Sequence, residues 1–137
     1  MASIPVERGD VLGRVMDRML EALSSHDARR FAALFADDYV SVQPAHPDRA
    51  FTGSEQVRKN WTEVFAGVPD FHAELVGTSV DGDTLWAEWH WTGTGLDMAG
   101  VVLFGIRDGL IAWARLYVEP VEQGEGIEAV VREMSGR

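Results

Sequence analysis

Turn sequences divide the second half of the chain into four strand-like segments. Asp81-Gly82-Asp83 and Asp108-Gly109 are typical of hairpin turns, and Gly93-Thr94-Gly95 forms a third connection. The segments are rich in the β-branched and aromatic residues that sheets favour. They cover residues 71–80, 84–92, 98–107 and 110–118. Because strands joined by short turns pair antiparallel, this half of the chain predicts an antiparallel meander that ends at Pro120.

The first half of the chain has helical periodicity instead. From Asp10, the expected N-cap, apolar residues such as Val11, Val15 and Met19 recur at spacings of three and four. The same reasoning extends to the rest of this half. It predicts helices over residues 10–23, 28–35 and 54–66, a short strand over 39–42 and a loop over 43–50.

The length of 137 residues suits a single domain. Residues 1–9, which contain Pro5 and Gly9, are interpreted as a flexible leader, and residues 10–120 as the domain. Residues 121–137 form an acidic tail in which we expect a short amphipathic helix. The apolar face of that helix consists of Ile127, Val130, Val131 and Met134.

The composition argues against several kinds of function. There is no cysteine, which excludes disulfides and thiolate chemistry. The net charge of -10, from 12 basic and 22 acidic side chains, argues against a nucleic-acid partner. No apolar run approaches the roughly 20 residues that span a bilayer, and the first residues carry no secretory signal pattern. We therefore expect no membrane partner and a cytoplasmic location.

The order of these elements resembles the nuclear transport factor 2-like superfamily, in particular its SnoaL-like branch, over about residues 11–120. The matching stretches are Arg30–Asp38, Phe51–Trp61, Pro69–Phe71, Thr84–Gly93 and Gly105–Glu119. The resemblance implies an α+β fold in which a curved antiparallel sheet is wrapped around about three N-terminal helices to form a cone with a central pocket. It also implies a homodimer that pairs through the outer face of the sheet.

The resemblance allows two known chemistries of the superfamily to be compared with this chain. In a gapless alignment with ketosteroid isomerases, the catalytic tyrosine, base carboxylate and oxyanion-binding acid fall on Met19, Gln43 and Val102. The arginine and aspartate of a limonene-epoxide-hydrolase relay fall on Trp89 and Trp91. Neither mechanism is therefore expected, and these five positions are candidates for substrate binding instead.

Other side chains are expected in the pocket. Alternation places Phe104 on the same face as Val102, and the fold places Asn60 and Trp61 on the third helix beside the pocket. Asn60 would contact a ligand or lie on the exposed face of its helix.

The last strand has two equally apolar faces, so alternation cannot choose between them. The resemblance to steroid isomerases favours Trp113, Arg115 and Tyr117 as the inward set, with Trp113 as a substrate-binding wall. Arg115 would then anchor an anionic ligand group, with an ion pair to Glu119 or Glu88 as the alternative. Tyr117 would donate a hydrogen bond to a ligand carbonyl, or be a core tyrosine.

Three further residues are candidates for general acid or base catalysis. His46 lies in the loop near the expected pocket mouth and would be a usable base, because imidazole groups exchange protons near neutral pH, or would be a solvated loop residue. Asp97 would be a base at the pocket rim or a turn residue. Glu119 would be a base or a structural partner of Arg115.

We expect no cofactor and no metal. The glycine-rich segment 93–100 lies between strands and not before a helix, which is the wrong context for a dinucleotide. His72 with Glu74, and Glu88 with His90, form two pairs on neighbouring strands. Because both pairs lie opposite the apolar faces, cross-strand salt bridges or a dimer interface are favoured over a metal site.

These observations predict a protein that binds a hydrophobic or aromatic small molecule. One hypothesis is a SnoaL-like enzyme, such as a polyketide cyclase or isomerase that uses general acid and base chemistry. The alternative is a non-catalytic ligand-binding or accessory protein, which the missing carboxylates favour. A third, a water-activating hydrolase of the epoxide-hydrolase kind, is disfavoured by the missing relay.

Overall fold

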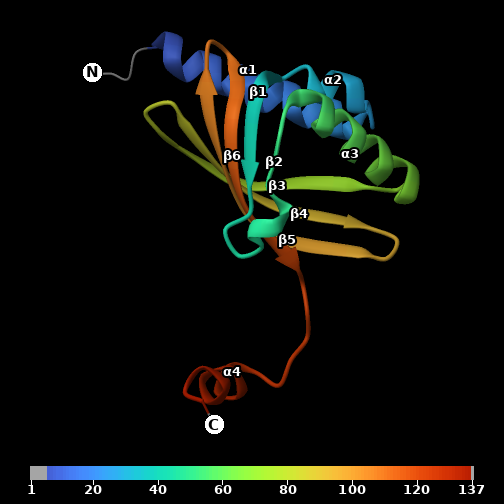
Figure 1. The fold of residues 1–137 in the computed structure, drawn as a ribbon, viewed down its shortest axis with the longest axis vertical. Helices are drawn as coiled ribbons and strands as arrows, with labels where there is room; N and C mark the ends of the chain where they lie inside the picture. The colour runs from blue at the N-terminus through green and yellow to red at the C-terminus, as the bar shows by residue number, and fades with distance from the viewer. Residues whose placement is uncertain (1–5, 137) are drawn as a thin grey trace.

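The structure is a computed structural model that describes residues 6–136, the first five of these by their backbone alone. The helices are α1 (Val6–Ser24), α2 (Ala28–Ala32), α3 (Ser54–Gly67) and α4 (Ile127–Met134), with a 3-10 turn η1 (Pro47–Arg49). The strands are β1 (Phe35–Val42), β2 (Phe51–Thr52), β3 (His72–Asp81), β4 (Thr84–Gly93), β5 (Leu96–Arg107) and β6 (Leu110–Pro120). Figure 1 shows α1, α2 and α3 grouped against a curved sheet, and α4 apart from this body. The α+β fold expected from the resemblance is confirmed.

All six strands belong to one sheet, in the order β2-β1-β6-β5-β4-β3. The meander from β3 to β6 is antiparallel throughout. The sheet as a whole is mixed, because β1 pairs parallel with β6, Val40 lying opposite Trp113. The prediction of a purely antiparallel sheet is therefore wrong at this one junction. Pairing between strands so far apart in the chain leaves no local pattern in the sequence.

The chain forms β1 where a helix was expected to continue. Helix α2 ends at Ala32, and the strand begins at Phe35, four residues before the predicted start. The register of β1 against β6 shifts between Phe35 and Val40. Because of this irregularity two buried residues are followed by two exposed aspartates, Asp37 and Asp38, and simple alternation is lost.

The N-terminal boundary also differs from the prediction. Helix α1 begins at Val6, so residues 6–9 are helical and do not belong to a leader. Residues 1–5 of the predicted leader lie outside the described residues.

The concave face of the sheet and the first three helices enclose the core. On β4, Leu85, Ala87 and Trp89 are buried, whereas Trp86 and Glu88 between them are exposed. This alternation agrees with the predicted inward face of that strand. Helices α1 and α3 cover the concave face with apolar stripes, of which Leu12, Met19 and Val57 are almost fully buried. The core and the space inside it therefore lie between the helices and the sheet.

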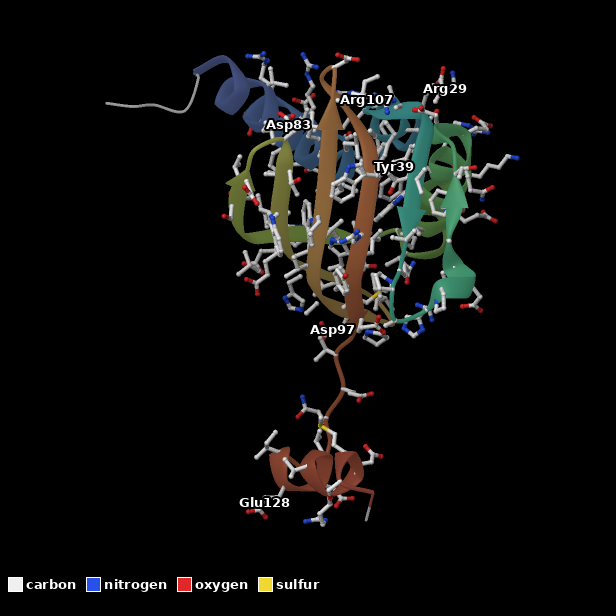
Figure 2. The ribbon with its side chains drawn as sticks, turned by 60° about the vertical axis from the view of Figure 1, so that its left-hand side comes forward. Arg29, Tyr39, Asp83, Asp97, Arg107 and Glu128 are labelled. Carbon is white, nitrogen blue, oxygen red and sulfur yellow. The ribbon has the colours of Figure 1, made fainter. Side chains whose placement is uncertain are left out.

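Beyond Pro120 the chain leaves the body of the protein. Residues 121–126 have no regular structure and lead to α4, which forms where the tail pattern predicts a helix. No residue of α4 is buried, and its apolar face, including Ile127 and Met134, is exposed. Figure 2 shows Asp97 at the end of the sheet from which the chain leaves towards Glu128 on α4.

Candidate functional site

A cavity of about 220 Å³ lies between the helices and the concave face of the sheet. This volume is below the roughly 300–1,000 Å³ that is typical of ligand pockets. Its walls come from α1, α2, α3 and five of the strands; β3 and α4 contribute no lining residue. The lining residues are Met19, Leu23, Phe31, Phe35, Tyr39, Ser41, Gln43, Phe51, Val57, Asn60, Trp61, Val64, Trp89, Trp91, Val102, Phe104, Ala114 and Leu116. None of these side chains is charged at neutral pH.

Aromatic rings form one continuous wall of the cavity. The ring of Trp61 lies 5.1 Å from Phe31 and 5.5 Å from Trp91, centroid to centroid, with edge-to-face geometry in both contacts. Phe35 and Tyr39 form a similar edge-to-face pair 4.7 Å apart. Such contacts are favourable beyond the burial of the rings and hold each ring in one orientation. The wall is therefore suited to a flat apolar ligand.

A line of polar side chains interrupts this aromatic wall. Tyr39 and Ser41 alternate on β1 and point into the cavity, and Gln43 follows directly after the strand. Tyr39 is 3% exposed and Ser41 2% exposed. Burial raises the pKa of the Tyr39 phenol to about 12, and the neighbouring Ser41 side chain acts in the opposite direction. The phenol is therefore neutral and protonated at physiological pH.

Two indole groups in the same walls have no hydrogen-bond partner. The Nε1–H groups of Trp89 and Trp91 are shielded from solvent, and no acceptor lies within reach of them in the described part of the chain. Most buried donors in proteins are paired, so two unpaired donors beside one cavity need an explanation.

The mouth of the cavity lies at one end of the lining strands. On β1 burial falls from Ser41 to Gln43, and on β4 it falls from Trp89 to Trp91. Gln43 is held at this mouth by Arg49, whose Nη1 donates to Oε1 over 3.1 Å.

The expected substrate-binding positions fall into two groups. Met19, Gln43 and Val102, which align with catalytic residues of ketosteroid isomerases, all line the cavity. So do Asn60, Trp61, Trp89, Trp91 and Phe104. Asn60 lies at the cavity edge with its Oδ1 accepting a hydrogen bond from Gln56 Nε2 at 2.8 Å. Trp113 does not line the cavity.

The predicted inward face of the last strand is wrong. Ala114 and Leu116 of β6 line the cavity, whereas Arg115 and Tyr117 are exposed on the outer face of the sheet. The guanidinium of Arg115 lies 5.8 Å from the centre of the Trp113 ring, in cation–π geometry. The small inward side chain of Ala114 leaves room for the cavity.

The three acid and base candidates lie outside the cavity lining. His46 Nε2 lies 3.0 Å from Glu119 Oε1, so these two residues form a pair between the β1–β2 loop and the end of β6. Asp97 accepts a hydrogen bond from His90 Nε2 at 2.7 Å on the exposed side of the β4–β5 hairpin. Glu74, opposite His90 in the register, lies 3.8 Å from its Nδ1. Of the four residues in the two predicted strand pairs, Glu74 and His90 form a cross-strand contact of the predicted kind.

Sequence reasoning missed the two most deeply buried polar residues of the site, Tyr39 and Ser41. A signal was present, because residues 39, 41 and 43 alternate Tyr, Ser and Gln beside apolar or turn residues. Within residues 6–136 no group of three or more His, Cys, Asp or Glu side chains is arranged to hold a metal ion. Nor does any helix of this part have the length and apolar character needed to cross a membrane.

The fold is shared with many solved structures, three of which illustrate the range. A nuclear transport factor 2-like protein of unknown function from Mesorhizobium loti is 26% identical, with a TM-score of 0.70, over 82% of this chain and 93% of that one. A proposed ketosteroid isomerase from Kribbella flavida is 19% identical, with a TM-score of 0.67, over 91% of this chain and 87% of that one. A proposed polyketide cyclase from Sinorhizobium meliloti is 21% identical, with a TM-score of 0.64, over 77% of this chain and 94% of that one.

The cone with an internal cavity thus defines a protein of the nuclear transport factor 2-like class. The family model for the SnoaL-like domain matches residues 16–114, and the chain belongs to this family. No curated protein matches the sequence.

Proposed function

We propose that this protein binds an uncharged, hydrophobic or aromatic small molecule in its cavity and does no acid–base chemistry there. The observation that carries the proposal is the lining, in which no side chain is charged at neutral pH. Moving a carboxylate or an ammonium group from water into such a site costs far more than moving a neutral ring. The aromatic wall around Trp61 offers the matching surface.

The lining also argues against catalysis inside the cavity. General acid–base catalysis needs a group whose pKa lies near the working pH. The titratable side chain of the lining is Tyr39, and its pKa of about 12 leaves it without a role as a base near neutrality. The isomerase and cyclase named among the structural neighbours share the fold, and a fold alone does not define an activity.

A second candidate function is general acid–base catalysis by the His46–Glu119 pair. The 3.0 Å contact favours it, because a carboxylate that orients an imidazole is a common catalytic arrangement. Such an enzyme would be a cyclase or isomerase that acts on a ligand projecting from the cavity. Conversion of the ligand by the wild type and its loss in His46→Gln would support this alternative.

The binding proposal is tested by titrating the protein with naphthalene and with 1-naphthoate, which differ in one carboxylate. Binding is followed through the five indole N–H signals in two-dimensional ¹H–¹⁵N NMR spectra. Naphthalene is expected to shift the signals of Trp61, Trp89 and Trp91, which line the cavity. Trp86 and Trp113, on the outer face, are the internal controls. Naphthoate is expected to bind at least about tenfold more weakly.

Equal or tighter binding of naphthoate would contradict the proposal that the ligand is uncharged. Shifts confined to Trp86 and Trp113 would show that the ligand lies on the outer face and not in the cavity.

We also propose that the protein is a homodimer paired through the outer face of the sheet. Exposed apolar residues gather there from three strands: Val40 of β1, Trp86 of β4 and Tyr117 of β6. Exposed apolar residues on one face of a sheet are typical of interaction sites. Sedimentation of the wild type as a dimer, and of the double variant Trp86→Lys, Tyr117→Lys as a monomer, would support this. Ile127→Lys, on α4, is the control that should remain dimeric.

A further inference from the structure

The volume of the cavity restricts the size of its ligand. An apolar protein cavity of about 150 Å³ holds one benzene molecule. The cavity of this protein, at about 220 Å³, is larger by roughly half. This increase corresponds to one further fused ring, because a fused ring shares two carbon atoms with its neighbour. A ligand with three or four fused rings is larger than this space.

Aromatic side chains at the mouth limit the space in which a longer ligand would extend. Trp91 lies at the mouth end of β4 and is half-buried, whereas Trp89 is 1% exposed. The rings of Trp91 and Trp61 are 5.5 Å apart, centroid to centroid, and nearly perpendicular at 84°. Phe71 contacts both, at 5.4 Å from Trp61 and 6.2 Å from Trp91. Because other rings pack against it, the Trp91 ring cannot turn aside for a longer ligand without disturbing them.

The two tryptophans of β4 contribute bulk to the cavity and no hydrogen bond. The Nε1–H groups of Trp89 and Trp91 are shielded from solvent and have no acceptor in the described part of the chain. The same shielding closes them off from the cavity, so a ligand cannot reach either group. A buried donor without a partner is a cost to stability. What both positions supply to the cavity is therefore the volume of a large ring.

We infer that the cavity takes neutral ligands of one or two fused rings and excludes larger ring systems, with Trp91 as the residue that sets this limit. The inference rests on the proposed function, because it concerns the ligand of the same cavity. It is more specific, since it adds an upper size to a class of ligands that the lining defines only by polarity. The ring of Trp91 occupies the space that a third ligand ring needs.

The test compares naphthalene with phenanthrene, two neutral hydrocarbons that differ by one fused ring. Equilibrium dialysis, with the protein in excess and each hydrocarbon below its solubility, gives both dissociation constants. A cavity with room for phenanthrene would bind it about tenfold more tightly than naphthalene, because more apolar area leaves water. We expect the wild type to bind phenanthrene no more tightly than naphthalene.

Two substitutions test whether Trp91 sets the limit. Trp91→Leu frees space beside Trp61, and we expect the affinity for phenanthrene relative to naphthalene to rise at least about fivefold. Trp91→Phe removes one of the two indole rings and should raise this ratio by a smaller factor. It keeps an aromatic ring in the wall, so it carries the test if Trp91→Leu does not fold. Trp86→Leu is the matched control on the same strand, 41% exposed on the outer face, and should leave the ratio unchanged.

The outcomes separate the inference from the function on which it rests. If the wild type binds phenanthrene about tenfold more tightly than naphthalene, the inference is wrong and the binding proposal stands. The same conclusion follows if the ratio in the folded variants at position 91 equals that of the wild type. If neither hydrocarbon binds, the binding proposal and the inference fail together.

Discussion

The backbone of β5 at Gly100 lies so close to β6 that a Cβ atom there would be 2.0 Å from the carbonyl oxygen of Tyr117. Gly100 also has a φ angle of +154°, which side chains rarely adopt. Because the obstruction is backbone, no rotamer change can relieve it. This contact fixes a glycine at the position in β5 that pairs with Trp89 of the cavity wall.

We predict that Gly100→Ala destabilises the fold strongly, by about 2–4 kcal/mol, through overpacking and backbone strain. Urea unfolding of the two proteins measures this difference. Gly77→Ala, on β3, is the matched control, because a Cβ at that glycine meets no atom within 4 Å. If Gly100→Ala has the same free energy of unfolding as Gly77→Ala, the backbones of β5 and β6 are not as close at Gly100 as the structure shows.

The raised pKa of Tyr39 predicts a loss of stability at high pH. The folded-state value of about 12 lies above the ordinary value of 10.0, so the unfolded chain releases this proton first. The contribution of the neutral phenol is complete below pH 10 and is lost as the pH rises from 10 to 12. Over that range the free energy of unfolding should fall by roughly 2–3 kcal/mol from this group.

The Tyr39→Phe variant provides the comparison. Urea unfolding at pH 9 and at pH 11.5 should show a smaller decrease for the variant than for the wild type. If the two proteins lose the same stability over this interval, Tyr39 does not titrate as a buried phenol.

Arg115 is predicted to be dispensable for ligand binding. It stacks over Trp113 on the outer face of the sheet and lines no part of the cavity. Arg115→Gln should therefore bind naphthalene within about twofold of the wild type, since a distant substitution leaves the pocket contacts unchanged. A tenfold loss of naphthalene affinity in Arg115→Gln, with unchanged stability, would mean that the guanidinium contacts the ligand.

The tail beyond Pro120 is predicted to add little to the stability of the domain, although Val121 N–H donates a hydrogen bond to the Asp97 carbonyl oxygen at 2.8 Å. Helix α4 has no buried residue, and burial of apolar surface is the main source of stability. Deletion of residues 121–137 should leave the melting temperature within about 1–2 °C, whereas Leu12→Ala in the core should lower it by several degrees. A large decrease in the deletion variant would mean that α4 packs against the domain in solution.

The inward faces that sequence analysis assigned correctly belong to regular strands. Trp89 and Trp91 lie on β4, where alternation separates a more apolar face from a more polar one, and Val102 and Phe104 lie at every second position of the neighbouring strand β5. Periodicity then suffices, since every second side chain lies on the same side. The third helix and its Trp61 could be placed for the same reason, at the helical period.

The errors occurred where alternation was ambiguous or broken. Strand β6 is apolar on both faces, and the decisive feature is size: Ala114 faces the cavity and bulky Trp113 lies outside. In β1 the register shift hid the first four residues, and the predicted strand over 39–42 was too short for its inward face, with Tyr39 and Ser41, to be assigned to the cavity. The pairing of His46 with Glu119 joins two distant segments and depends on the finished fold. The periodicity of a sequence shows neither which side chains fit together by size nor which distant segments pair in the folded protein.

The parallel contact between β1 and β6 has a consequence for the order of assembly. The last strand of the domain lies in the middle of the sheet, between β1 and β5. During synthesis, β1 has no partner on that side until the residues around Trp113 have left the ribosome. The strand that carries Tyr39 and Ser41 can therefore be connected to β5 and β4 only after β6 has been synthesised. A chain truncated before β6 would lack this connection and the part of the cavity wall formed by Ala114 and Leu116.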